Sequence, residues 1–234
     1  MRSAVLALLI AGLAAPALAN EGKLDYDHQE KWSAALDRAQ SPIDIVTASA
    51  TPASGDEPQA LEFRLSDDVD KVEDNGHAVQ VDTHAAQAQI RGRHFSLAQF
   101  HFHAQSEHTI DGRHYPLEGH FVFKAQDGRL AVVGVMFQEG AANAAAQTII
   151  DDLAAHAATA RDIDIEALMP KKHEYYHYLG SLTTPPLTEN VEWYVLAAPV
   201  TMSKDQLGAF LARYPHNNRK IQPLNGRPVI HSAG

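Results

Sequence analysis

The sequence predicts an α+β domain that is dominated by strands, with a large twisted and mostly antiparallel central β-sheet and a few peripheral helices. Three observations lead to this expectation. Short runs of strand composition follow one another along the chain, Asn-Gly and Asp-Gly dipeptides separate several of them, and helical patterning is confined to two segments. These dipeptides favour the tight turns of hairpins, which place consecutive strands antiparallel. A chain of 234 residues suits one sizeable domain.

The first 19 residues have the form of a secretory signal peptide. Arg2 precedes an apolar run of about a dozen residues, and the small-residue segment Ala17-Leu18-Ala19 follows it. The run is too short to span a bilayer. We therefore expect a signal peptide over residues 1–19, export of the chain, and a mature domain over residues 20–234 without a membrane span.

The mature chain divides into a loop, seven strands and two helices. Residues 47–60 are rich in Ala, Pro, Ser and Thr and indicate a surface loop. One helix is expected within 141–157, and another from Ser203, whose capping box with Gln206 precedes an apolar pattern that stops at Pro215. The expected strands are 61–65, 77–82, 88–92, 97–103, 119–125, 130–137 and 191–198. The turn dipeptides between them are Asn75-Gly76, Asp111-Gly112 and Asp127-Gly128.

The composition of the chain argues against nucleic-acid binding and excludes cysteine chemistry. The formal net charge is -10 and no dense run of lysine and arginine is present, so nucleic acids are poor partners for this surface. The chain has no cysteine, so neither a disulfide nor a thiolate ligand or nucleophile can form. Any metal must therefore be bound by nitrogen and oxygen.

The segment "QFHFHAQSEH" (99–108) places two histidines on one face of a strand. Because side chains alternate across a strand, Gln99, His101 and His103 share one face, while Phe100 and Phe102 form the apolar face. With 14 histidines in the chain, such a pair could be a chance feature of a strand. Imidazoles on a core-facing strand nevertheless need partners, and a metal would supply them.

A third imidazole donor, His120, begins another expected strand in "EGHFVF". Three imidazoles with one open position suit catalytic zinc, which lowers the pKa of its bound water to about 7. Gln99 and Glu118 are placed to accept hydrogen bonds from such ligands.

An alternative metal site adds Glu107 as a fourth ligand. The pair of histidines, Glu107 and the later Pro116, Gly119 and His120 resemble the metal motif of cupins, which would suit iron or manganese. In that motif a glycine is expected after the glutamate and an asparagine after the last histidine, and neither lies at the expected interval here.

Motifs along the rest of the chain resemble the α-class carbonic anhydrases. They run in family order from about Gln40 to Arg227 and cover nearly the whole mature chain. They are "QSPIDI", "DNGHAVQV", "QFHFHAQSEHT", "LEGHFVF", "GSLTTPPLTENVEW" and "IQPLNGR", with "YDHQEKW" as a weaker N-terminal match.

The resemblance implies zinc as cofactor and gives roles to the residues around it. The implied zinc ligands are His101, His103 and His120. Their imidazoles would be oriented by Gln99, by the backbone carbonyl of Asn217 and by Glu118, respectively. His108 and Tyr178 match a buried structural pair linked towards Glu118, so His108 would not be a ligand.

The resemblance also implies the catalytic residues. Glu107 would accept a hydrogen bond from Thr183, which in turn orients zinc hydroxide towards CO2, and Thr184 would contact bound bicarbonate or inhibitors. His77 would carry the proton between the site and buffer, because an imidazole titrates near the pKa of the zinc water. Asn75 and Gln80 match polar residues that flank this shuttle.

An apolar CO2 pocket is implied as well. Its walls would be Val122, Val132, Leu182 and Trp193. A strict two-residue loop at Asp127-Gly128 would pair Val122 with Val133, whereas a bulge at Gly128 would bring Val132 opposite Val122. The resemblance therefore predicts a bulged hairpin.

The expected function is the zinc-dependent, reversible hydration of CO2 to bicarbonate and a proton, by zinc-hydroxide attack with a histidine proton shuttle. The alternative is a non-catalytic relative that binds zinc or a partner. The resemblance further implies inhibition by sulfonamides and small anions, and a homodimer as in many exported bacterial relatives. The signal peptide implies a periplasmic or secreted protein.

Overall fold

The structure, a computed structural model, describes residues 24–54, 61–156 and 160–233, so the expected signal peptide lies outside the described residues. Within these ranges no helix is long and apolar enough to cross a membrane. The helices are η1 (Gln29–Lys31), η2 (Thr47–Ser49), α1 (Ala144–Ala155), η3 (Ile165–Leu168) and α2 (Lys204–Arg213). The strands are β1 (Asp44–Ile45), β2 (Thr51–Pro52), β3 (Leu61–Arg64), β4 (Lys71–Asp74), β5 (Val79–Asp82), β6 (Gln87–Ile90), β7 (Arg93–His103), β8 (Thr109–Ile110), β9 (Leu117–Lys124), β10 (Leu130–Glu139), β11 (Tyr175–Ser181), β12 (Glu189–Leu196), β13 (Val200–Met202) and β14 (Ile230–Ser232).

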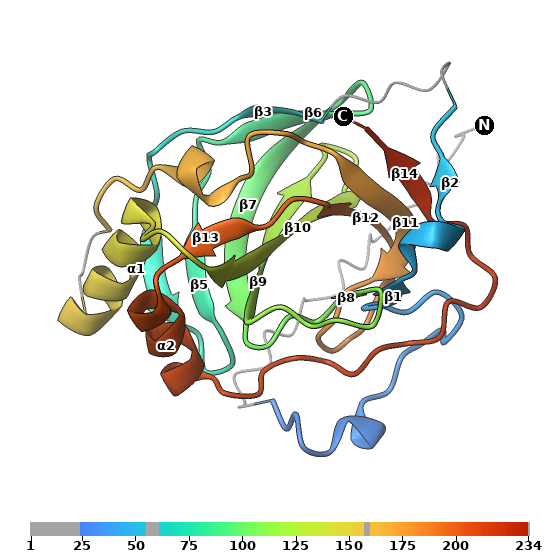
Figure 1. Cartoon of the computed structure of the whole chain (residues 1–234), viewed down its shortest axis with the longest axis horizontal. Coiled ribbons are helices and arrows are strands. Elements are labelled where there is room, and N and C mark those ends of the chain that lie inside the picture. Colours follow the sequence, from blue (N-terminus) through green and yellow to red (C-terminus); the bar gives the residue numbers. More distant parts are fainter. Residues whose placement is uncertain (1–23, 55–60, 157–159, 234) are drawn as a thin grey trace, which may run out of the picture.

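A twisted sheet forms the centre of the described part of the chain (Figure 1). It has 12 strands, and its main path runs β2-β14-β11-β12-β10-β9-β7-β5-β4, with β6 and β3 extending from β7 and β13 from β10. Most neighbours are antiparallel, which confirms the expected strand-dominated architecture. β10 is parallel to β12 and to β13, because the chain forms α1 and β11 before it returns beside β10.

The two faces of this sheet bury different side chains. One apolar cluster contains Phe100, Phe102, Phe121 and Phe123, and the other contains Val132 and the face of β12 that carries Trp193. Because strand residues alternate, the face opposite the four phenylalanines carries the histidines of β7 and β9. The alternation of side chains along β7 therefore places His101 and His103 together on one face of the sheet.

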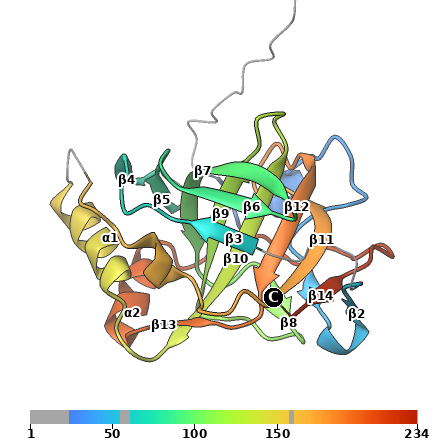
Figure 2. The same cartoon turned by 90° about the horizontal axis from the view of Figure 1, so that it is seen from above.

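The α-helices lie together at one end of the sheet (Figure 2). In α1, the side chain of Asn143 caps the first turn by accepting from the backbone N–H of Ala146. In α2, Ser203 and Gln206 form the expected capping box. Residues 47–52, expected within a surface loop, form η2 and β2, which pairs with β14.

The hairpin between β9 and β10 has the bulged register. Val122 lies opposite Val132, and Lys124 lies opposite Leu130. Gly128 adopts a φ of +88°, which glycine reaches without the steric cost of a Cβ atom. The extra loop residue shifts β10 by one position, so Val132 rather than Val133 faces the site.

Candidate metal centre and active site

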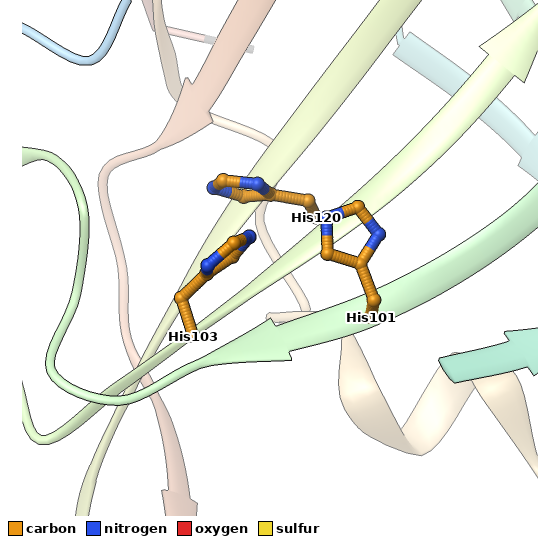
Figure 3. A group of neighbouring side chains, drawn as sticks. All are labelled: His101, His103 and His120. Atoms are coloured by element: carbon orange, nitrogen blue, oxygen red, sulfur yellow. The ribbon is translucent and has the colours of Figure 1, made fainter. Parts of the chain in front are cut away.

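Three histidines converge on one point of the sheet (Figure 3). His101 and His103 come from β7, and His120 comes from β9, directly opposite His101. One nitrogen from each imidazole lies within 4.8 Å of the corresponding nitrogens of the other two. His103 and His120 are buried, with 0% and 1% of their surface exposed. The paired strands fix these positions, so the cluster is preorganised to bind a metal.

Each imidazole is held at its other nitrogen by an oxygen. Gln99 Oε1 lies 2.8 Å from Nδ1 of His101. The backbone oxygen of Asn217 lies 2.6 Å from Nδ1 of His103. These contacts are those of ring N–H donors with carbonyl acceptors, so they leave Nε2 of both rings free to bind a metal.

The third ring is oriented the other way. Glu118 Oε1 lies 3.0 Å from Nε2 of His120, which leaves Nδ1 of His120 to face the cluster. Nε2 of His103 is buried and has no hydrogen-bond partner among the described residues. A buried nitrogen without a partner is costly, and a metal ion would satisfy it. Three imidazole nitrogens without sulfur fit zinc with one open coordination position.

The electrostatics keep the three rings neutral. Burial lowers the pKa of His103 to about 4, and burial together with the neighbouring imidazoles lowers the pKa of His101 well below its usual value. Burial also lowers the pKa of His120, although Glu118 opposes this effect. The rings therefore carry free lone pairs at neutral pH, as metal ligands must.

Glu118 connects the cluster to the core. Its Oε1 accepts from Nδ1 of His108 at 2.8 Å as well as from His120, and its Oε2 accepts from the backbone N–H groups of Glu107 and His108 at 2.8 and 2.9 Å. Nε2 of His108 lies 2.7 Å from the hydroxyl of Tyr178. Burial alone would raise the pKa of Glu118, but His108 and His120 lower it well below its usual value. This carboxylate therefore stays ionised and anchors His120.

Glu107 is fully buried beside the cluster but outside it. Its Oε1 accepts from the backbone N–H of Arg219 at 2.6 Å, and its Oε2 lies 3.8 Å from Nδ1 of His120. Burial raises the pKa of Glu107 to about 7, while His120 and the hydroxyl of Thr183 lower it. Among the described residues, no donor makes a hydrogen bond of normal geometry to Oε2 of Glu107, and the hydroxyl of Thr183 interacts with this carboxyl only weakly. The three-histidine group forms without Glu107, which does not favour the four-ligand cupin arrangement.

The apolar residues expected to line a CO2 pocket belong to or pack against one apolar cluster, in which Trp193 lies next to His120. Val132 pairs with Val122 on β9 and with Trp193 on β12. The indole ring of Trp193 is centred 4.8 Å from the imidazole of His120. Leu182 packs against the same apolar cluster. In the segment between β11 and β12, Thr183 is buried and Thr184 is half-buried.

His77 lies in the turn between β4 and β5 and is half-buried. Asn75 Oδ1 accepts from the backbone N–H of His77 at 3.1 Å, and the Asn75 amide donates to Gln80 at 2.9 Å. Gln80 lies opposite His101 on β7. Burial lowers the pKa of His77. The imidazole borders a cavity of about 410 Å³, which Asn217 and Tyr26 also line.

Comparison with known proteins identifies the family. The model of the eukaryotic-type carbonic anhydrase family matches residues 26–233. The chain belongs to this family. A carbonic anhydrase of Pectobacterium atrosepticum is 45% identical over 198 residues, which cover 82% of this chain and 79% of the relative. This match confirms the family and the enzyme class expected from the motifs.

Solved carbonic anhydrases share the fold. The α-carbonic anhydrase of Thermovibrio ammonificans, in complex with sulfanilamide, is 40% identical with a TM-score of 0.76, and the match covers 82% of this chain and 87% of that one. A carbonic anhydrase of Chlamydomonas reinhardtii, in complex with acetazolamide, is 32% identical with a TM-score of 0.76, over 91% of this chain and 98% of that one.

Two residues of this carbonic anhydrase site received no role from the sequence. The hydroxyl of Tyr26 is buried without a partner among the described residues, and burial and Glu107 raise its pKa. The weak motif "YDHQEKW" was its only signal. Gly134 lies opposite His120, and a Cβ there would lie 3.0 Å from Oε1 of Glu118. No periodicity marks such a close approach.

Proposed function

We propose that this chain is a zinc enzyme that reversibly converts CO2 and water to bicarbonate and a proton, with His77 as proton shuttle. The observation that carries the proposal is the convergence of three imidazole nitrogens whose partner nitrogens are all held by oxygen acceptors. Zinc bound by His101, His103 and His120 would supply a nucleophile at neutral pH by lowering the pKa of water.

The residues around the cluster have complementary tasks. The hydroxyl of Thr183 lies close enough to Glu107 to lower the pKa of that carboxyl, so it would donate its proton towards Glu107 and keep its oxygen lone pairs to orient the attacking oxygen. Val122, Val132 and Trp193 offer CO2 an apolar wall, which suits a substrate without charge. Thr184, the half-buried neighbour of Thr183, would contact bicarbonate.

The proton leaves by a separate route. His77 is half-buried beside a cavity, and imidazole is the side chain suited to accept and return a proton in this pH range. Burial lowers its pKa, and the charge of Asp74 opposes this effect. Asn75 donates a hydrogen bond to Gln80, and Gln80 lies opposite His101, so this pair connects the turn of His77 to the strand of His101. Sulfanilamide and acetazolamide occupy the solved relatives, which supports inhibition of this chain by the same compounds.

Metal content and CO2 hydration test the proposal together. Purified protein is expected to contain about one zinc per chain and to hydrate CO2 in a stopped-flow assay that acetazolamide inhibits. His101→Ala should lose both zinc and activity. His94→Ala is the matched control, because His94 lies on the same strand and is exposed. Zinc-free wild-type protein contradicts the proposal, and zinc-loaded protein without CO2 hydration favours the non-catalytic alternative.

We also propose that residues 1–19 direct export to the periplasm or the medium. The form of this segment supports the proposal. N-terminal sequencing of the protein from fractionated bacterial cells should begin at Asn20, whereas a retained Met1 in the cytoplasmic fraction contradicts it.

Size-exclusion chromatography with light scattering of the same material tests the expected homodimer.

A further inference from the structure

The turn that carries His77 is held by the C-terminal end of α2. Asp74, the last residue of β4, accepts from the backbone N–H of Gly76 at 3.0 Å through Oδ1. Its Oδ2 accepts from Nε of Arg213 at 2.7 Å, and the hydroxyl of Tyr214 also donates to its carboxylate. One carboxylate therefore joins the turn to residues that lie 139 and 140 positions away in the sequence.

Asn217 holds the other side of the same turn. Its Nδ2 donates to the backbone oxygen of His77 at 2.9 Å and to that of Phe102 at 3.0 Å. Its Oδ1 accepts from the backbone N–H of Ala104 at 2.8 Å, while its backbone oxygen is the acceptor for His103. The segment 213–217 therefore contacts the shuttle turn at both of its ends, and Asn217 also contacts the strand that carries His101 and His103.

The hydrogen bonds inside the turn run through Asn75, whereas its tip at Gly76 has no packing of its own. Gly76 has a φ of +89°, and the space around its Cα is open, since a Cβ there would meet no atom within 4 Å. An exposed turn tip without packed neighbours moves more easily than the strands beside it, so contacts from outside the turn help to fix it. Arg213 and Tyr214 also line the cavity that His77 borders. The same residues thus border the space into which a proton would leave.

We propose that Asp74, Arg213 and Tyr214 are positioning residues for His77 and form a clamp that keeps the shuttle imidazole at a fixed distance from the metal ligands. This inference rests on the proposed function of His77. Proton transfer requires donor and acceptor within hydrogen-bond reach, directly or through water, so a displaced turn slows the export of the proton without changing the attack on CO2.

Arg213→Gln and Tyr214→Phe are better tests than a change of Asp74. The negative charge of Asp74 raises the pKa of His77 against the effect of burial, so its removal would alter the imidazole itself. The two chosen changes keep that carboxylate and remove its side-chain donors. Arg129→Gln is the matched control, because Arg129 also forms an exposed ion pair, with Asp127 at 3.3 Å, in a different turn.

The experiment compares kcat and kcat/KM for CO2 hydration in dilute buffer. kcat/KM covers the steps up to the release of bicarbonate, whereas kcat also contains the later export of the proton. The double variant Arg213→Gln/Tyr214→Phe is expected to lose kcat roughly 3- to 10-fold, less than His77→Ala, at nearly constant kcat/KM. Added imidazole should restore the rate. The control should retain both constants.

Three outcomes distinguish a failure of the clamp from a failure of the His77 shuttle. A double variant with unchanged kcat, beside a slow His77→Ala, overturns the clamp and leaves the shuttle intact. Equal rates for His77→Ala and wild type overturn the shuttle and the clamp with it. A parallel loss of kcat and kcat/KM that imidazole does not restore indicates general damage and also overturns the clamp. If the double variant unfolds, Tyr214→Phe alone provides the same readouts.

Discussion

Replacing Glu118 by glutamine probes the link between the metal centre and the core. Each carboxylate oxygen accepts two hydrogen bonds, Oε1 from the rings of His108 and His120, and Oε2 from the backbone N–H groups of Glu107 and His108. Glutamine turns one of these acceptors into an NH2 donor, so in either orientation two buried N–H groups lose their partner. At about 1–3 kcal/mol for each unsatisfied group, the free energy of unfolding should fall by roughly 2–6 kcal/mol.

The same change should weaken zinc binding. If the new NH2 group faces the rings, His120 must accept at Nε2, which moves its proton to Nδ1 and removes the lone pair that faces the cluster. Loss of such an outer acceptor costs about 10- to 100-fold in metal affinity. Denaturant unfolding and zinc competition with a chelator measure the two effects. Glu139→Gln, an identical change at an exposed end of β10, is the control. If both variants match wild type in both assays, the reasoning is wrong.

Two further predictions concern pH and Glu107. Metal-free protein should lose stability as the pH falls from about 6.5 to about 4, because burial lowers the pKa of all three ligand histidines, to about 4 for His103, so the unfolded chain binds more protons there. Glu107, with a pKa raised to about 7, opposes this trend, as do the exposed His28 and His84, whereas the lowered pKa of His77 adds to it. A stability that is flat or rises on acidification would contradict the prediction. Glu107→Gln should retain zinc while CO2 hydration slows, since the three-histidine group forms without it; stoichiometric zinc loss would instead support the four-ligand arrangement.

Local patterns predicted the elements that hold the site. The alternation in "QFHFHAQ" gave the two faces of β7, because residues on a strand point to opposite sides. The dipeptide Asp127-Gly128 marked the hairpin but left two registers open, and the family resemblance selected the bulged one that pairs Val122 with Val132. The capping box at Ser203 marked the start of α2. Each of these features depends on residues close together in the sequence.

The features that the sequence did not reveal depend on distant contacts. β11 was not expected, because its first residues Tyr175 and Tyr176 are both buried, one on each face, so no apolar-polar alternation marks the start of the strand. The parallel pairing of β10 with β12 has no turn signal. The contact of Asp74 with Arg213 joins two ordinary surface residues, and no pattern of spacing or composition indicates it.

Asn217 limits how this enzyme could be re-engineered. Its amide fixes the backbone of His77, and its carbonyl fixes the ring of His103. A substitution that repacks this position would therefore alter both the proposed proton path and the proposed zinc site. Asp74 and Arg213, which are 34% and 37% exposed at their side chains, reach the turn without touching a ligand. Substitutions at Asp74 or Arg213 would therefore be expected to change proton transfer without changing metal binding. Substitutions at Asn217 would be expected to change both properties at once.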